Sequence, residues 1–241
     1  MADIISPDRS DAAKENKDAK DMEQTKQPII AFLGDGITMG SGASDKKCGF
    51  CARLEEMTGF TIENLGAERS RIVSQLYGSD QGFLKRSATL DPKADVVFVF
   101  GGTNDFEPGN VALGKLGDKD TGTFYGALAL LCESLLKRYR KEQLTFVLPM
   151  PRFDENQAKG FAPLSAYCSA IEEVADFFGI FALDLTGIFP VPQDDCGDEY
   201  TIDGIHPNDR GHDFLAQIFT CYLWDHYRYN PVCFPKEDSF K

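Results

Sequence analysis

Short apolar runs alternate with longer amphipathic stretches along most of this chain. Five of the runs are rich in β-branched or aromatic residues and apolar at successive positions, as strands buried on both faces of a parallel sheet are. They cover Ile29–Leu33, Phe60–Leu65, Val96–Phe100, Leu144–Leu148 and Ile180–Leu185. We expect these runs to be the strands of one mainly parallel sheet.

The stretches between these runs carry apolar residues at helical spacing. The predicted helices cover Cys48–Met57, Ser70–Leu76, Thr123–Lys141, Pro163–Phe178 and Pro207–Tyr227. Pro207 suits the first turn of the last helix, because its missing N–H has no helical partner there. Alternating strands and helices predict a three-layer α/β domain with helices on both faces of the sheet.

The first 28 residues do not follow this pattern. They are rich in Asp, Lys and Gln, and their isolated apolar residues show no period. We therefore expect residues 1–28 to be a disordered leader and residues 29–241 to be a single domain. The leader lacks the apolar core of a secretory signal, and no run approaches the ~18 apolar residues of a membrane span. These features predict a cytoplasmic protein that does not enter the membrane.

The net charge of the chain argues against two classes of partner. Its formal net charge is −13 at pH 7, whereas nucleic acid and anionic membranes are bound by basic faces. We therefore expect neither as a partner. Neither Gly-x-Gly-x-x-Gly nor a complete phosphate-binding loop, Gly-x-x-x-x-Gly-Lys followed by Ser or Thr, occurs, so no nucleotide or flavin cofactor is expected.

The seven cysteines are odd in number and irregularly spaced, which is typical of reduced thiols. Cys48 and Cys51 form a Cys-x-x-Cys motif, as a redox pair or half of a zinc site would. No second Cys or His pair completes a metal site, so we expect no metal. Two ordinary thiols on the helix after the first strand are the favoured interpretation.

Three polar motifs carry the candidate chemistry. Gly34-Asp35-Gly36-Ile37-Thr38 follows the first strand, Gly101-Gly102-Thr103-Asn104-Asp105 follows the third, and Asp203-Gly204-Ile205-His206-Pro207 precedes the last helix. Loops at the carboxyl ends of parallel strands bind ligands in α/β sheets. We therefore expect the three motifs to form one site.

The residue types in these motifs suit acyl transfer from an ester, which needs a nucleophile, a base, a group that orients the base and donors for the oxyanion. His206 is the candidate base, and Asp203 lies one turn earlier, where it can hold the imidazole in one tautomer. The Asn104 amide can donate to the oxyanion, and Gly102 allows a sharp backbone turn beside it. We expect Asp35 to fix the turn after the first strand by accepting backbone N–H bonds.

These motifs resemble the conserved blocks of the SGNH (GDSL-type) hydrolases, which are serine esterases, lipases, thioesterases and carbohydrate deacetylases on a flavodoxin-like α/β fold. The resemblance covers roughly Ile29 to Tyr227. It implies a Ser-His-Asp triad with His206 and Asp203, and an oxyanion hole formed by the backbone at position 36, the backbone at Arg69 and the Asn104 amide. It also implies short acyl esters, including acetyl esters on carbohydrate, as ligands, and no cofactor.

The chain departs from this family pattern at two positions. Gly36 stands where the family has its nucleophilic serine. Arg69 stands where the family has a glycine whose backbone N–H joins the oxyanion hole, unless a local shift of the alignment places Gly66 or Ser70 there. Losing one triad member costs on the order of 10⁶ in kcat and leaves about 10⁻⁵ s⁻¹ from a typical enzyme.

Two interpretations follow. In the first, the chain is an ester hydrolase whose nucleophile was replaced at position 36, so that it is inactive or very slow. In the second, it is a natural pseudoenzyme that binds an acyl, carboxylate or sugar-like ligand without turnover, with Arg69 and Arg71 facing an anionic group. A third interpretation, a structural or interaction domain, has no feature in its favour.

Other residues near the motifs bear on access and on the missing hydroxyl. Ser41, Ser44 and Ser70 could stand in as nucleophiles. We disfavour all three, because the family geometry belongs to the strand-to-helix turn itself. Glu107–Gly122 and Arg152–Phe161 are predicted to be surface excursions that shape substrate access.

Overall fold

The strands form one five-stranded sheet in which every pair is parallel. The computed structural model describes residues 27–73, 82–107, 111–156, 162–190 and 192–227. The strands are β1 (Ile29–Gly34), β2 (Thr61–Gly66), β3 (Val96–Phe100), β4 (Leu144–Val147) and β5 (Phe181–Leu183). Their order, β2-β1-β3-β4-β5, is the flavodoxin-like order, which confirms the predicted fold class.

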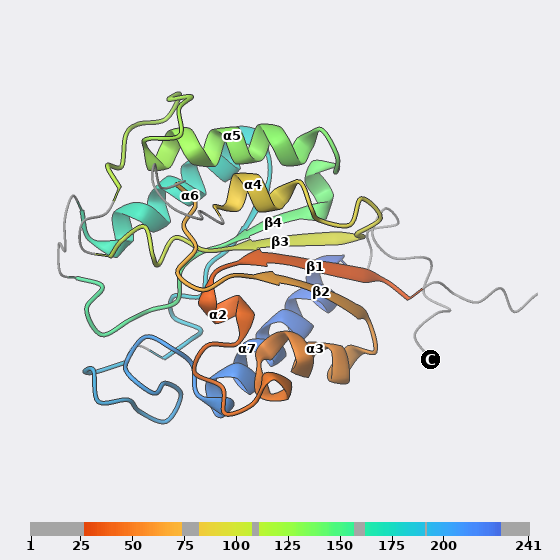
Figure 1. Ribbon diagram of the computed structural model, residues 1–241, viewed down its shortest axis with the longest axis vertical. Helices are drawn as coiled ribbons and strands as arrows, with labels where there is room; N and C mark the ends of the chain where they lie inside the picture. The colour runs from red at the N-terminus through yellow and green to blue at the C-terminus, as the bar shows by residue number, and fades with distance from the viewer. Residues whose placement is uncertain (1–26, 74–81, 108–110, 157–161, 191, 228–241) are drawn as a thin grey trace, which may run out of the picture.

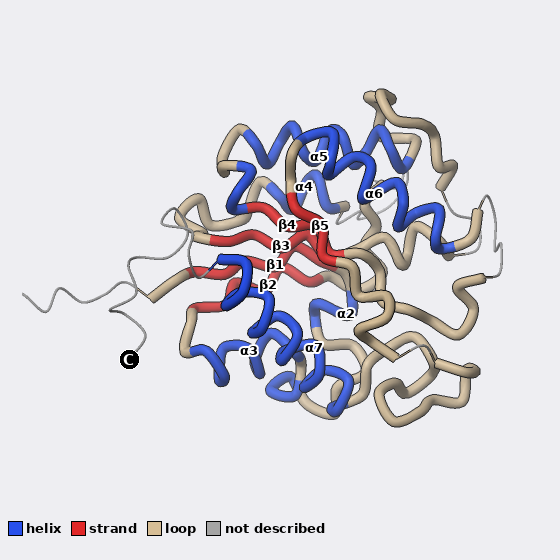
Figure 2. The backbone as a smooth tube through the Cα atoms, turned by 180° about the vertical axis from the view of Figure 1, so that it is seen from behind, coloured by secondary structure: helices blue, strands red, loops and turns tan. Residues whose placement is uncertain are grey.

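Helices cover both faces of this sheet (Figure 1; Figure 2 from behind). One face carries α4 (Phe83–Ser87), α5 (Phe124–Leu136) and α6 (Leu164–Phe178), and the other carries α2 (Gly36–Met39), α3 (Phe50–Thr58) and α7 (Asp209–Tyr222). Short 3₁₀ turns occupy Lys46–Cys48 and Lys141–Gln143, and a π-helical turn at Leu223–Tyr227 continues α7. The arrangement is the predicted three-layer sandwich.

The register of the sheet brings the candidate loops to one edge. Gly34, the last residue of β1, pairs with Gly66 of β2 and with Phe100 of β3. These three strands therefore end at the same level. The first and second polar motifs, which follow β1 and β3, leave the sheet side by side at this carboxyl edge.

Each face of the sheet has its own apolar cluster. On the α3 and α7 side, Phe32 of β1 stacks on Phe98 of β3 with ring centroids 4.9 Å apart, and Phe50 and Phe219 meet Phe32 edge to face. Aromatic pairs of this kind stabilise a core beyond their buried area. This cluster anchors α3 and α7 on the sheet, and with them the loops that flank the candidate site.

The two edge strands differ from the prediction that all five strands are buried on both faces. β2 has no fully buried residue, and Phe181 in β5 is 40% exposed. An edge strand has a neighbouring strand on one side only, so its side chains are more exposed to solvent than its apolar sequence suggests. β1, β3 and β4 are buried as predicted, apart from the partly buried first residue of β1.

The helix predicted over Ser70–Leu76 is wrong where the structure describes it, because residues 70–73 are not helical. The backbone N–H groups of Ile72 and Val73 each donate to the Asp105 carboxylate at 3.0 Å. A side chain more than 30 positions away thus holds this backbone in a conformation that is not helical. Residues 74–76 lie outside the described part of the chain, and α4, further along, was not predicted.

The last helix begins two residues later than predicted. Asn208 is its N-cap and accepts bonds from the N–H groups of Arg210 and Gly211, both at 3.0 Å. Pro207 instead forms a β-bridge with Thr201. The side-chain oxygen of Asn208 accepts hydrogen bonds from the first N–H groups of the helix, whereas Pro207 has no side-chain acceptor that could do so.

Two further expectations concern the leader and membrane-spanning segments. Residues 1–26, most of the predicted leader, lie outside the described residues. Over the described ranges, no helix has both the length and the apolar character needed to cross a membrane.

Candidate active site

The first motif folds into a single helical turn directly after β1. Asp35 is the N-cap of α2 and accepts a bond from the backbone N–H of Ile37 at 3.0 Å, as predicted from its place in the turn. Gly36 is the first residue of α2 and is buried. Gly40 ends the turn in the left-handed region at φ 108°. Position 36 therefore has the helical backbone of a strand-to-helix elbow.

The third motif presents an aligned acid and base. Nδ1 of His206 lies 2.7 Å from Oδ2 of Asp203, and Oδ1 of Asp203 accepts the backbone N–H of His206, also at 2.7 Å. Burial opposes ionisation of Asp203, but the bonds from His206 outweigh it and lower the pKa of this carboxyl. The carboxylate is therefore charged at neutral pH and favours the tautomer in which Nδ1 carries a proton.

The loop after α2 packs against this acid–base pair. Gly42 has φ 93°, and a Cβ placed on it would lie 2.2 Å from the carbonyl oxygen of Pro207 and 3.1 Å from Cβ of His206. Only a glycine can approach so closely in this conformation. The charge of His206 also lowers the pKa of Asp35 against the larger effect of burial. The first and last motifs therefore lie close together at this edge of the sheet.

Asn104 joins the second motif to the first. Its amide donates to the carbonyl oxygen of Ser70 at 3.1 Å and, over a long 3.4 Å, to Oδ2 of Asp35. Gly102, two residues earlier, has φ 112°, so the sharp turn expected there requires glycine. The structure thus places Asn104 beside the residue that precedes Gly36.

Arg69 has a backbone conformation unusual for its residue type. Its φ of 54° is the one positive value among the described non-glycine residues, and this region favours glycine. The backbone thus takes a glycine-type bend at the position where the family resemblance implies a glycine. Gly66, the alternative, is packed instead on α2, because a Cβ there would lie 2.2 Å from the backbone nitrogen of Met39.

Two side chains occupy the space beside position 36. A Cβ placed on Gly36 would lie 2.9 Å from Oγ of Ser41 and 3.0 and 3.1 Å from the carboxylate oxygens of Glu68. Ser41 donates its hydroxyl proton to Glu68 at 2.7 Å. The sequence analysis did not identify Glu68. In the sequence, Glu68 is marked only by its place next to Arg69. Its contact with a serine 27 positions away follows from the fold.

Two arginines that the sequence analysis did not assign to the site hold its loops. Arg86 is buried and donates to the carbonyl oxygens of Gly34 and Leu65 and to Oγ of Ser70. It thereby fastens the ends of β1 and β2 to the Ser70 segment. Buried arginines need several acceptors to offset the loss of water, and main-chain carbonyls leave no trace in a sequence.

The second of these arginines, Arg152, contacts the loop after β3. Its side chain is 1% exposed, pairs with the buried Asp154 and with Glu107, and contacts Oγ1 of Thr103 at 3.4 Å. It therefore links both predicted excursions, Glu107–Gly122 and Arg152–Phe161, to the residue before Asn104. The prediction that Arg152 begins a surface segment is wrong, because its guanidinium is part of the interior.

Two buried carboxyl groups lie behind the site. Burial raises the pKa of both Asp35 and Asp105 to about 7, although each accepts backbone N–H bonds that lower it. The charge of Asp35 also raises the pKa of Asp105. Since both folded-state pKa values exceed the unfolded value near 3.9, the folded protein binds these protons more tightly than the unfolded chain.

We expect this to make stability fall as pH rises through the range from ~4 to ~7, by up to about 1.4 kcal/mol per pH unit for each group. Asp105→Asn removes one of the two titrations, so its free energy of unfolding should depend less steeply on pH. Urea unfolding at several pH values between 5 and 8 measures this. Asp176→Asn, at an exposed position of α6, is the control. An equal slope for Asp105→Asn and the unaltered chain would contradict the assignment.

The cysteines of the Cys-x-x-Cys motif are free thiols. Cys51 is buried in α3, and burial raises its pKa well above the usual value. Cys48 ends the preceding 3₁₀ turn and accepts a weak bond from Ser44. Within the described ranges, the one group of metal-ligand side chains within 4.8 Å of one another is Asp194, Asp195 and Cys196, all exposed. None of these belongs to the candidate site.

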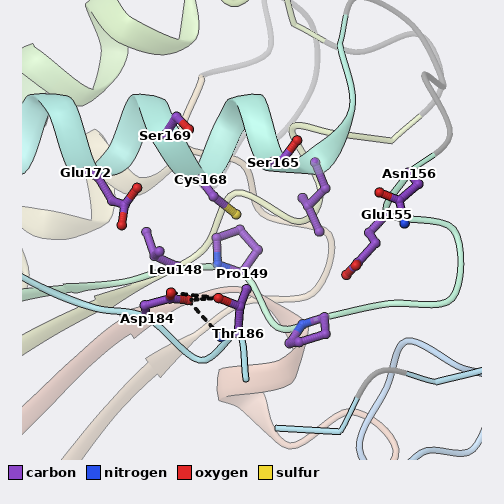
Figure 3. Close-up of a pocket in the computed structure, with 12 residues that line it drawn as sticks. Leu148, Pro149, Glu155, Asn156, Ser165, Cys168, Ser169, Glu172, Asp184 and Thr186 are labelled. Carbon is purple, nitrogen blue, oxygen red and sulfur yellow. Dashed lines mark hydrogen bonds between the residues drawn. The ribbon is translucent and has the colours of Figure 1, made fainter. Parts of the chain in front are cut away.

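A pocket of about 220 Å³ opens at the same edge of the sheet, between α6 and the ends of β4 and β5 (Figure 3). Cys168 and Glu172 of α6 line one side, and Asp184, bonded to Thr186, lies across from them. Pro149 also lines this pocket and lies 3.1 Å from the Cβ position of Gly102. The pocket therefore adjoins the Gly102 turn without including the candidate catalytic residues.

Known proteins share sequence and fold with this chain. Residues 32–214 match the GDSL-like lipase/acylhydrolase family. An acetylxylan esterase from Xylanibacter ruminicola is 26% identical over an alignment of 211 residues, which covers 80% of this chain and 42% of that protein. The chain therefore spans less than half the length of this curated relative.

Solved structures share the fold over nearly their whole length. A protein from Lactobacillus plantarum is 25% identical with a TM-score of 0.68, over 84% of this chain and 99% of that one. A lipase/acylhydrolase from Enterococcus faecalis is 17% identical with a TM-score of 0.62, over 82% and 95%. At this low identity the second likeness supports the fold alone.

Proposed function

Because the chain belongs to the GDSL-like lipase/acylhydrolase family, we propose that it acts on short acyl esters at the site formed by Gly36, Asn104 and His206. One observation carries this proposal: the 2.7 Å bond between His206 and Asp203, on a segment that packs against the loop after α2. The partner of this histidine is an ionised carboxylate. An acyl-transfer base needs one to fix its tautomer.

The remaining parts of the site suit the same reaction. In acyl transfer, negative charge develops on the carbonyl oxygen, and nearby N–H groups stabilise it. We assign this role to the backbone N–H groups of Gly36 and Arg69 and to the Asn104 amide. The 3.4 Å contact from Asn104 to Asp35 is long for a hydrogen bond, so little energy opposes the turn of this N–H towards an oxyanion.

Without a hydroxyl at position 36, His206 alone can activate only a water molecule. This route costs on the order of 10⁶ in rate and leaves about 10⁻⁵ s⁻¹. We propose acetyl esters on carbohydrate as the first substrates to examine, because the curated relative is an acetylxylan esterase. An uncharged ester also suits a site in which Glu68 holds a negative charge beside position 36.

A second candidate function is binding of such a ligand without turnover. The glycine at position 36 and the arginine in a glycine-type conformation at position 69 favour it. In this case a neutral acetylated sugar should bind and free acetate should not, because Glu68 repels a carboxylate. Calorimetry with acetylated xylo-oligosaccharide, the deacetylated sugar and acetate distinguishes these ligands.

We expect His206→Ala to lower acetate release roughly 10²- to 10⁴-fold, the usual contribution of a general base. Acetate released from p-nitrophenyl acetate and from acetylated xylo-oligosaccharide is measured at high protein concentration. His226→Ala is the matched control, since His226 lies in the π-helical turn after α7, stacked on Tyr222. Equal losses in the two variants would remove His206 from the reaction.

A further inference from the structure

The hydroxyl of Ser41 and the carboxylate of Glu68 fill the space that a side chain on residue 36 would take. We propose that this pair replaces the missing serine: Ser41 is the nucleophile of this chain, and Glu68 is the base that takes its proton. The inference rests on the proposed ester hydrolysis at this site. It changes which residue forms the covalent intermediate.

Distances support Ser41 in this role. Its Oγ lies 2.9 Å from the Cβ position of residue 36, whereas a serine at 36 would hold its own Oγ about 1.4 Å from that carbon. The hydroxyl of Ser41 is therefore displaced by no more than a few ångströms from the elbow. It already donates to a carboxylate at 2.7 Å, and a nucleophile bonded to its base is the arrangement that activates a hydroxyl.

The backbone of Ser41 is fixed on both sides. Its N–H donates to the carbonyl oxygen of Gly36 at 2.8 Å, and its carbonyl oxygen lies 3.1 Å from Nε2 of His212. Nδ1 of His212 accepts the N–H of Phe50 at 3.3 Å, so Nε2 carries the proton and donates to Ser41. Burial lowers the pKa of His212, which favours this neutral form. The hydroxyl is thus held ready before any ligand binds.

The other two serines near the site have structural partners. Ser44 donates its hydroxyl to Asp209 at 2.6 Å, at the start of α7. The hydroxyl of Ser70 accepts from Arg86 at 2.6 Å, and its carbonyl oxygen accepts from Asn104. Of the three serines, Ser41 is the one whose hydroxyl is among the nearest atoms to the Cβ position of Gly36. The sequence disfavours Ser41 because the family geometry belongs to the strand-to-helix turn itself, but in the structure the Ser41 hydroxyl lies against that turn.

The proposed reaction has two steps. In the first, Glu68 takes the hydroxyl proton of Ser41, Oγ attacks the acyl carbon, and the ester bond breaks. The departing alkoxide takes the proton back from Glu68 and leaves as alcohol. In the second, His206 takes a proton from water, the hydroxide attacks the acyl-Ser41 ester, and the carboxylic acid departs. Oγ of Ser41 recovers its proton from His206, so no oxidant, metal or other reactant is needed.

The position of His206 agrees with this division of roles. Gly42, the residue after Ser41, lies against Cβ of His206, so the segment that carries the imidazole packs directly against the Ser41 loop. Ser41 donates its proton to Glu68 and not to an imidazole. A carboxylate is a weaker base than an imidazole. We therefore expect the chain to be faster than the water route and slower than an enzyme with serine at position 36.

The test compares Ser41→Ala and Glu68→Gln with the unaltered chain. Initial rates on p-nitrophenyl acetate should fall roughly hundredfold or more in both variants, with kcat affected more than KM for Glu68→Gln. A serine-directed fluorophosphonate should label the unaltered chain at Ser41, as located by peptide mass spectrometry. Ser169→Ala, at an exposed position of α6, is the control for rate and labelling, and melting temperatures show that all variants fold.

The same Ser41→Ala change in a Gly36→Ser background separates this inference from the proposed function. It should cost much less there, because the hydroxyl at position 36 takes over the attack. An active Gly36→Ser variant beside an unaltered chain whose rate and labelling do not depend on Ser41 overturns this inference alone. An inactive Gly36→Ser variant overturns the proposed function, and this inference with it.

Discussion

Gly36→Ser should raise the hydrolysis of short acyl esters roughly 10³- to 10⁶-fold over the unaltered chain. The upper end applies if water is the present nucleophile, and the lower end if Ser41 already acts. The reason is that the imidazole, the orienting acid and the Asn104 amide are in place. A hydroxyl on the elbow then completes an acyl-transfer site.

The structure has room for this serine. Gly36 has no left-handed φ, so its backbone suits any residue, and the two near contacts of a Cβ are the ends of the Ser41 and Glu68 side chains. Such ends can rotate away at little cost. Gly36→Ala is the matched control, since it adds the same carbon without a hydroxyl. If Gly36→Ser were no faster than Gly36→Ala on p-nitrophenyl acetate, the site would not be an acyl-transfer site.

Arg152→Met should lower the free energy of unfolding by about 3–5 kcal/mol. The change removes the guanidinium that faces the buried Asp154 carboxylate, and a buried charge that loses its countercharge is costly. For a domain of this size the loss corresponds to a fall in melting temperature of roughly 6–20 °C. Thermal unfolding followed by circular dichroism measures it.

Arg210→Met is a close control for this change. Arg210 also pairs with a glutamate, Glu199 at 2.6 Å, and lies over the ring of Tyr200 as Arg152 lies over that of Phe106. Its side chain is 64% exposed, and exposed ion pairs contribute about 0–1 kcal/mol. Similar losses in the two variants would mean that burial does not set the strength of the Arg152 contacts.

The sequence predicted the fold class because the central strands are marked by their own composition. Val96–Phe100 consists of valine and phenylalanine only, and the structure buries all of it. The helix expected at Ser70 failed for a reason outside its own sequence. Its N–H groups are taken by Asp105, more than 30 positions away. Local pattern predicts elements where tertiary contacts agree with it, and fails where a distant side chain competes for the backbone.

The candidate site was predictable in part for the same reason. Asp203 and His206 are three residues apart, so their contact could be inferred from spacing. Ser41 and Glu68 share no spacing rule, and Arg152 reads as a surface charge until Asp154, Glu107 and Thr103 are seen around it. Contacts between distant segments were missed, although each of these residues was visible in the sequence.

The C-terminal helix has a consequence for the lifetime of the assembled site. His212 and Asp209 of α7 hold Ser41 and Ser44 of the loop after α2, and that loop rests against the segment leading into the same helix. Transient local unfolding of α7 would therefore release the Ser41 loop and the His206 segment together. The fraction of time in which a ligand meets a complete site is bounded by how rarely this helix opens.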